Sequence, residues 1–163
     1  MRCNGILQTV ISRASDGVAL KKEGRCGMER EMTIEASVSN LDEVLAFVDA
    51  RLEEAGCGMK TQMQIDVAVE EIYVNIASYA YASGRGMAVI AVDIDKDKKQ
   101  IIIEFRDSGM EFDPLAKPDP DTTLSAQERQ IGGLGIYMVK KSMDDMTYTR
   151  SDGQNILTLY KNF

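Results

Sequence analysis

The spacing of apolar residues changes from segment to segment along this chain, and the order of these changes restricts the fold. Alternating or Val- and Ile-rich segments indicate strands, whereas apolar residues three and four positions apart indicate helices. The sequence predicts, in chain order, a strand at 32–38, helices at 41–55 and 60–82, strands at 87–95 and 100–106, a glycine-led helix ending near residue 143, and strands at 146–151 and 155–161. Because strands and helices segregate, we expect an α+β fold, a two-layer sandwich in which one mixed sheet is covered on one face by three helices.

The first 27 residues show no comparable period. The strand pattern begins just after a second methionine, Met28, which we interpret as the natural start of the protein. We therefore expect residues 1–27 to be a disordered or non-native extension and residues 28–163 to form one domain.

Composition excludes several classes of function. The formal net charge of −7 disfavours direct binding to nucleic acid or to an anionic membrane surface. The chain has no histidine, which excludes Ser–His and Cys–His nucleophiles and histidine metal sites. The three cysteines form no CxxC pair, and no apolar run is long enough to span a bilayer, so a reducing cytoplasm is the expected location.

The second expected helix contains AVEEIYVNIASYAY, which places Glu71 and Asn75 four residues apart on one face. One interpretation is a solvated helix edge with exposed carboxylates. The other is a site in which the amide oxygen of Asn75 binds Mg²⁺ and Glu71 acts as a general base one helical turn away.

Two glycine-containing segments follow. In RDSGMEFDP, Asp107 ends a strand, and its carboxylate could accept a hydrogen bond from an exocyclic amine such as that of adenine, while Gly109 would let a base lie flat; an ordinary turn is the alternative. In RQIGGLGIYMVKKSMDD, three glycines lead into a helix, either as a loose loop or as a phosphate cradle at a helix N-terminus. The long segment between them, 107–131, contains all three prolines, and such loops are usually functional.

The three motifs together, in this order, resemble those of the GHKL (Bergerat-fold) ATPase superfamily. The stretches AVEEIYVNIASYAY, DSGMEFDPLAKPDPDTT, ERQIGGLGIYMVKKSMDD and NILTLYK are most similar to bacterial anti-sigma-factor serine/threonine kinases. The resemblance covers nearly all of residues 32–161. One departure is Tyr79, which stands where the family often has histidine.

The resemblance implies a role for each matching residue. Asn75 would hold Mg²⁺, Glu71 would be the catalytic base, and residues 111–131 would form a lid over ATP. The nucleotide contacts it implies are Asp107 and Gly109 at the adenine, Arg129, Gly133 and Gly135 at the phosphates, and Thr158 as a support of Asp107 through water.

The resemblance also implies an activity and partners. It implies phosphorylation of a STAS-type anti-sigma antagonist with Mg·ATP, partner-switching control of transcription, binding of a sigma factor, and a possible homodimer. A non-catalytic, nucleotide-dependent protein-binding module is the alternative. Neither a Walker A segment nor the histidine-containing protein-kinase motif is present in the sequence.

Overall fold

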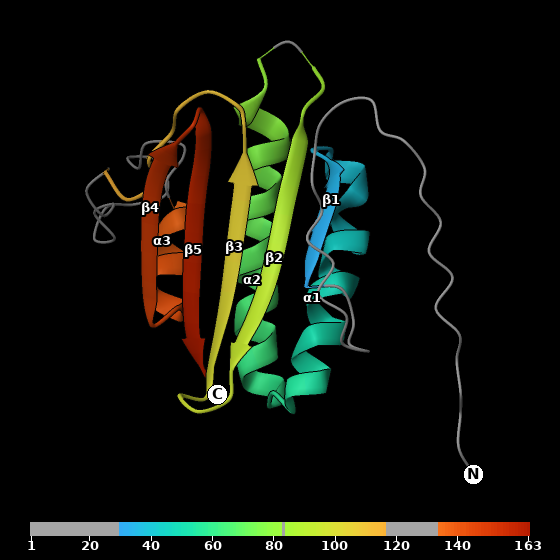
Figure 1. Cartoon of the computed structure of the whole chain (residues 1–163), viewed down its shortest axis with the longest axis vertical. Coiled ribbons are helices and arrows are strands. Elements are labelled where there is room, and N and C mark those ends of the chain that lie inside the picture. Colours follow the sequence, from blue (N-terminus) through green and yellow to red (C-terminus); the bar gives the residue numbers. More distant parts are fainter. Residues whose placement is uncertain (1–29, 83, 117–133) are drawn as a thin grey trace, which may run out of the picture.

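The computed structural model describes residues 30–82, 84–116 and 134–163 (Figure 1). Residues 1–27, expected to be an extension, therefore lie outside the described residues. The elements are β1 (Glu31–Glu35), a 3₁₀ turn η1 (Val38–Asn40), α1 (Leu41–Ala55), α2 (Met59–Asn75), a π-helical segment η2 (Ile76–Ala80), β2 (Met87–Asp95), β3 (Gln100–Asp107), α3 (Leu134–Ser142), β4 (Asp145–Ser151) and β5 (Gln154–Asn162).

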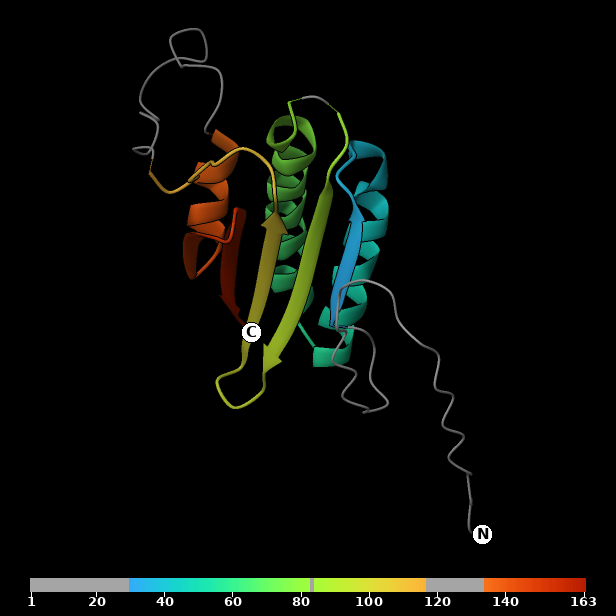
Figure 2. The ribbon, with the colours of Figure 1, turned by 45° about the horizontal axis from the view of Figure 1, so that its top comes forward.

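The described residues form two layers. The five strands make one sheet in the order β1-β2-β3-β5-β4, and the three α-helices cover one of its faces with α2 in the middle (Figures 1 and 2). This arrangement confirms the expected α+β sandwich. The central position of α2 follows from its apolar stripe, in which Ile65, Ala68 and Val69 have no exposed surface.

The sheet differs in one respect from the expected mixed sheet, because all four strand pairings are antiparallel. The element order gives the reason. Each successive helix or strand reverses the direction of the chain, and two helices separate β1 from β2, while α3 and β4 separate β3 from β5. An even number of intervening elements leaves the two strands of each neighbouring pair antiparallel.

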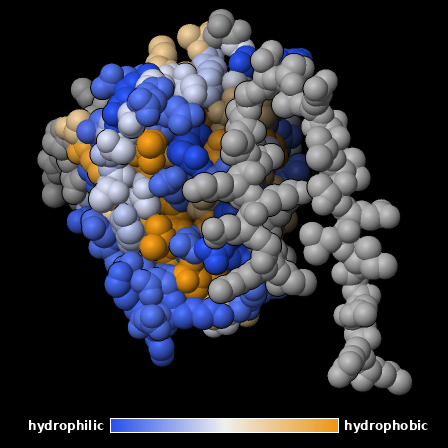
Figure 3. Space-filling view, in the orientation of Figure 1, coloured by the Kyte–Doolittle hydropathy of each residue, from blue (hydrophilic) through white to orange (hydrophobic). Residues whose placement is uncertain are grey.

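The pairing register decides which residues face the helices. Asp107 lies opposite Asn155, and Phe105 lies opposite Leu157, so these residues share the helix-covered face. The other face shows apolar patches among polar side chains (Figure 3), and the residues of β3 on this face are half-buried. On that face Arg106 forms ion pairs with Glu31 and Glu104.

The first strand ends at Glu35, earlier than the expected residue 38. The side-chain amide of Asn40 donates to the carbonyl of Glu35, and the hydroxyls of Ser37 and Ser39 are hydrogen-bonded to each other at 2.8 Å. Such local side-chain bonds compete with strand pairing and favour a turn. Helix α1 then begins at Leu41 and ends at Ala55, as expected, and the next residue, Gly56, has a φ of 72°, the left-handed conformation common after a helix.

Tyr73 connects α2 to the segment that follows β1. Its ring has no exposed surface, and its hydroxyl lies 3.0 Å from the carbonyl oxygens of both Glu35 and Ser37. Burial raises the pKa of the Tyr73 hydroxyl above its ordinary value, so the hydroxyl remains a hydrogen-bond donor at neutral pH. The end of β1 and the last turn of α2 are therefore held together across 38 residues of sequence.

Two carboxyl groups meet where α1 packs on α2. Asp49 accepts a hydrogen bond from Gln62 at 2.7 Å, and Oδ1 of Asp66 is buried without a donor from the described residues. Burial, together with the charge of Asp49 and a hydrogen bond to it, raises the pKa of Asp66 to about 6. Neutral pH therefore forces a second negative charge into the contact between the two helices.

We predict that Asp66→Asn stabilises the protein at neutral pH. The folded-state pKa of Asp66 lies above its ordinary value of 3.8, so the free energy of unfolding should fall as pH rises from about 4 to about 6 in the wild type. The variant lacks this loss and should gain on the order of 1 kcal/mol at pH 7.5, after allowing for partial solvent screening. Urea unfolding at pH 4 and pH 7.5 measures the difference, with Glu53→Gln on the exposed side of α1 as the control. Equal effects of Asp66→Asn at both pH values would contradict the prediction.

Candidate functional site

The end of α2 presents the two polar residues that the sequence singled out. Glu71 and Asn75 lie one turn apart and are both half-buried. Within the described residues, neither side chain has a hydrogen-bond partner. The helix changes to π-helical geometry directly after Asn75. Such π-helical turns occur frequently at functional sites, and a carboxylate and an amide oxygen without protein partners are suitable groups for contacting a bound ligand.

Glu71 lies against the first turn of α3. A β-carbon built on Gly135, the second residue of α3, would overlap Oε2 of Glu71. The structure thus brings together two of the motifs, which are 64 positions apart in the sequence. Only glycine leaves the Glu71 carboxylate this close to the backbone at the start of the helix.

The third motif, the Asp-Ser-Gly turn after β3, packs against the end of η2. A β-carbon at Gly109 would overlap the backbone carbonyl of Ala80, and the N–H of Met110 donates to that same carbonyl at 2.8 Å. The ring of Tyr81 lies against Gly86, and its hydroxyl accepts from the N–H of Ser108 at 3.0 Å. The polypeptide that follows Asn75 therefore fixes the position of the turn that carries Asp107.

Asp107 itself is buried, with 6% of its surface exposed. Its Oδ1 accepts hydrogen bonds from the N–H of Gly109 and from the side-chain amide of Asn155, both at 2.9 Å. No donor from the described residues reaches Oδ2, which leaves this oxygen available to an exocyclic amine.

Asn155 was not among the residues that the sequence singled out. Residues 155, 157 and 159 of β5 share one face, and residues 156, 158 and 160 share the other. Both sets are mostly apolar, so the sequence alone did not show which face is buried. The signal that would have found Asn155 is its register position directly opposite Asp107.

The structure does not bring Thr158 to Asp107. Thr158 lies opposite Glu104 on β3 and Thr147 on β4, three pairs from Asp107 and on the face of the sheet that the helices leave uncovered. The side chain next to the aspartate is that of Asn155. Thr158 is therefore not in a position to support Asp107 as expected.

Three other expectations concern residues near or within the expected lid. Arg129 and Gly133, and the part of the expected lid from residue 117 onward, lie outside the described residues.

Tyr79, the residue in the usual histidine position, lies on η2 with 70% of its surface exposed. Tyr79 is therefore not a core residue.

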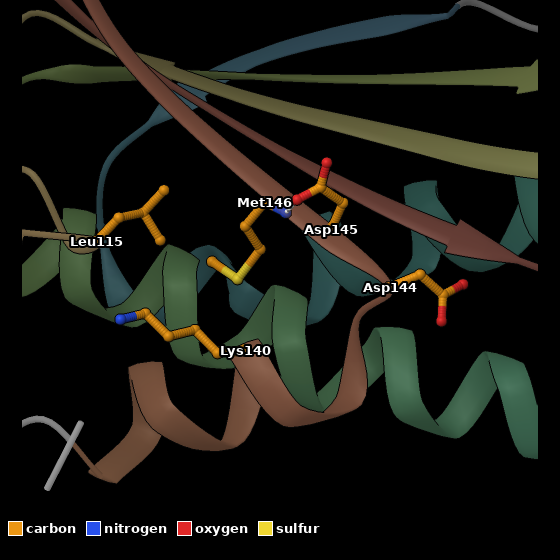
Figure 4. A pocket seen from close by; sticks show the side chains of 5 residues that line it. All are labelled: Leu115, Lys140, Asp144, Asp145 and Met146. Carbon is orange, nitrogen blue, oxygen red and sulfur yellow. Dashed lines mark hydrogen bonds between the residues drawn. The ribbon is translucent and has the colours of Figure 1, made fainter. Parts of the chain in front are cut away.

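A hollow of about 250 Å³ lies between the end of α3 and the start of β4 (Figure 4). It is lined by Leu115, Lys140, Asp144, Asp145 and Met146. Glu71, Asn75, Asp107, Gly109 and Gly135 are not among its lining residues, so the hollow is not part of the candidate site.

The geometry fits a nucleotide and a hard cation. Asp107 offers a carboxylate oxygen at one end, while Asn75 offers an amide oxygen of the kind that Mg²⁺ prefers. Two glycines, Gly109 and Gly135, allow close approach where any side chain would collide with Ala80 or Glu71. Within the described ranges, no three acidic or thiol side chains cluster as a metal site.

Comparison with known families decides the assignment. Residues 34–161 match the family described as the histidine kinase-like ATPase domain. The chain belongs to this family. The chain is 27% identical to the serine/threonine-protein kinase BtrW of Bordetella bronchiseptica over 100 residues, which are 61% of this chain and 70% of that protein. It is 28% identical to the serine-protein kinase RsbW of Bacillus cereus over 138 residues, which are 80% of this chain and 85% of that protein.

A solved structure gives the same fold. The structure of the RsbU and RsbW domains of Rv1364c from Mycobacterium tuberculosis superposes with a TM-score of 0.57 at 18% identity. The match covers 81% of this chain and 32% of that longer chain, so the present ATPase domain spans about a third of it. Among the helices of the described ranges, none has the length and apolar content that a bilayer span requires.

We predict that Gly109→Ala lowers both stability and nucleotide affinity. The new methyl group would meet a backbone carbonyl, which cannot rotate away as a side chain can, so the turn carrying Asp107 must shift. We expect a loss of about 2 kcal/mol in the free energy of unfolding and at least a tenfold weaker binding of ATP.

Thermal unfolding and calorimetric titration with ATP measure the two effects. Gly58→Ala is the matched control, since nothing lies within 4 Å of a β-carbon there. Wild-type affinity in Gly109→Ala would show that the close approach to Ala80 is not needed.

Proposed function

We propose that this chain is an ATP-dependent serine/threonine protein kinase that phosphorylates a STAS-type anti-sigma antagonist. The observation that carries the proposal is the contact between Glu71 and Gly135. It places a carboxylate at the start of α3, where the phosphate end of the nucleotide is expected, one helical turn from the magnesium-binding candidate Asn75. A general base is useful in phosphoryl transfer only at that place.

Each residue then has a stated task. Oδ2 of Asp107 accepts a hydrogen bond from the adenine amine, and Gly109 lets the base lie against the backbone. The amide oxygen of Asn75 would hold Mg²⁺, which would supply neutralisation of the phosphate charge. Glu71 accepts the proton from the substrate hydroxyl as the hydroxyl oxygen bonds to the transferred phosphoryl group and the bond to the ADP oxygen breaks.

Support for the activity comes from the relatives, two of which are named serine or serine/threonine protein kinases. The chain's partners rest on the same resemblance: an antagonist as substrate, a sigma factor as the protein it sequesters, and a second copy as dimer partner. Arg129 and Gly133 are proposed phosphate contacts on the resemblance alone.

We predict that Glu71→Gln abolishes phosphotransfer while leaving nucleotide binding within about threefold of wild type, because glutamine keeps the shape but cannot take a proton. The rate should fall by about 10² or more. Asn75→Ala should lose the magnesium dependence of ATP binding as well as activity. The measurement is transfer of the γ-phosphoryl label to the STAS-domain protein encoded nearest the gene.

The matched control is Glu70→Gln, which changes the exposed neighbour of Glu71 on the same helix and should keep wild-type activity. If wild type binds ATP and the STAS protein but transfers no label, the kinase proposal fails. The chain would then be a nucleotide-dependent binding module.

A second variant tests the contact itself. Gly135→Ala should displace the Glu71 carboxylate without unfolding the protein, because the group that must move is the flexible end of a side chain and alanine is a better helix former than glycine. We expect an unchanged or higher melting temperature and at least a tenfold slower phosphotransfer. Unimpaired transfer in this variant would separate Glu71 from the reaction.

A further inference from the structure

The buried amide of Asn155 is hydrogen-bonded at both ends. Its Nδ2 donates to Oδ1 of Asp107 at 2.9 Å and to the carbonyl of Met110 at 2.8 Å. Its Oδ1 accepts from Arg150 at 2.6 Å and from the hydroxyl of Tyr148 at 2.9 Å. With 6% of its surface exposed, Asn155 has little access to water that could replace these partners.

These partners fix which way the amide points. A guanidinium can only donate hydrogen bonds, so the group that faces Arg150 must be the oxygen of Asn155. The N–H of Phe112 lies on the same oxygen at 3.4 Å and favours the same orientation. The amino group of Asn155 is thereby turned toward Asp107, and a flipped amide would set two donors against each other.

The fixed amide in turn fixes Asp107. With Oδ1 held by Asn155 and by the N–H of Gly109, the carboxylate cannot rotate without breaking two hydrogen bonds. Oδ2 remains as the acceptor that a ligand meets. An amino group on a purine complements an acceptor, whereas a carbonyl oxygen at the same place would put two acceptors in contact.

Arg150 also holds the backbone beside the aspartate. Both of its terminal nitrogens lie 3.3 Å from the carbonyl oxygen of Gly109, and its Nε lies 3.8 Å from the carboxylate of Glu111. The turn that follows β3 is thus bonded to β4 as well as to η2. These contacts keep Gly109 and Asp107 in one relative position.

We infer that Asn155, oriented by Tyr148 and Arg150, is a positioning residue that makes the site select 6-amino purine nucleotides over 6-oxo purine nucleotides. The inference rests on the proposed nucleotide site. It assigns base selection to three residues of β4 and β5 that act through Asp107 and do not touch the base themselves.

The test compares the dissociation constants of Mg·ATP and Mg·ITP, since inosine carries a carbonyl oxygen where adenosine carries the amine. Wild type should bind ATP about 10- to 100-fold more tightly, the range expected for a hydrogen bond to a charged acceptor. Asn155→Leu, of similar size but without the amide, should reduce this ratio to within about threefold by weakening ATP binding. Tyr148→Phe should reduce it partly, because it removes one donor to the amide oxygen.

Thr149→Val is the matched control. Thr149 lies between Tyr148 and Arg150 on β4, but its exposed side chain is on the opposite face of the sheet, so the ratio should stay at the wild-type value. Melting temperatures are recorded for all variants. If Asn155→Leu fails to fold, Tyr148→Phe decides the question.

Two failures can be told apart. Folded Asn155→Leu and Tyr148→Phe proteins with the wild-type ratio of ITP to ATP dissociation constants would overturn the inference and leave the proposed kinase function in place. A folded wild-type protein that binds neither nucleotide would overturn the proposed function, and the inference with it.

Discussion

Burial of α2 between the sheet and its two flanking helices is the constraint on which the candidate site depends. The buried side of α2 anchors the helix through Ile65, Val69 and Ile72, so the positions of Glu71 and Asn75 follow from helical geometry. The same helix continues into η2, where the carbonyl of Ala80 meets the turn after β3. One continuous piece of chain therefore sets the distance between the residues expected at the phosphates and those expected at the base.

Carboxyl groups have different surroundings along α2. Midway along the helix, Asp66 meets Asp49 of α1 with few compensating groups, which raises the pKa of Asp66 and causes repulsion between the two helices. Near its end, Glu71 has no ion pair within the described residues, and Asp107 is stabilised by neutral donors alone. Neither carboxylate is paired with a cationic side chain of the described residues, so both remain available as hydrogen-bond acceptors for a ligand.

Much of the fold was predictable because the apolar patterns are strong and local. The helix at 41–55 and the strand at 87–95 have the predicted bounds, and the remaining described elements differ by a few residues at their ends. The antiparallel direction of every pair was not predicted, although it follows from counting the reversals of the chain. The π-helical ending of the second helix was also not predicted, since no residue in IASYA marks a widened turn.

The residues of the candidate site other than Asn155 were predictable from local motifs, whereas the contacts between the motifs were not. The spacing of Glu71 and Asn75 requires no knowledge of tertiary structure, whereas the contact of Glu71 with Gly135 depends on how α2 packs against α3. The sequence also did not show whether Asn155 or Thr158 faces Asp107, because a strand with apolar residues on both sides does not reveal which side the helices cover. Strand register, a property of the sheet as a whole, decided between them.

The hairpin of β4 and β5 has a consequence for how such a site can change over evolutionary time. Its strands are joined by a two-residue turn, Asp152 and Gly153, both with positive φ, as in the tight turns typical of such hairpins. Tyr148, Arg150 and Asn155 therefore fall within eight consecutive positions. A contiguous segment of this length can change as a unit, so the proposed preference for the base can diverge among relatives while the proposed phosphate end on α2 and α3 stays the same.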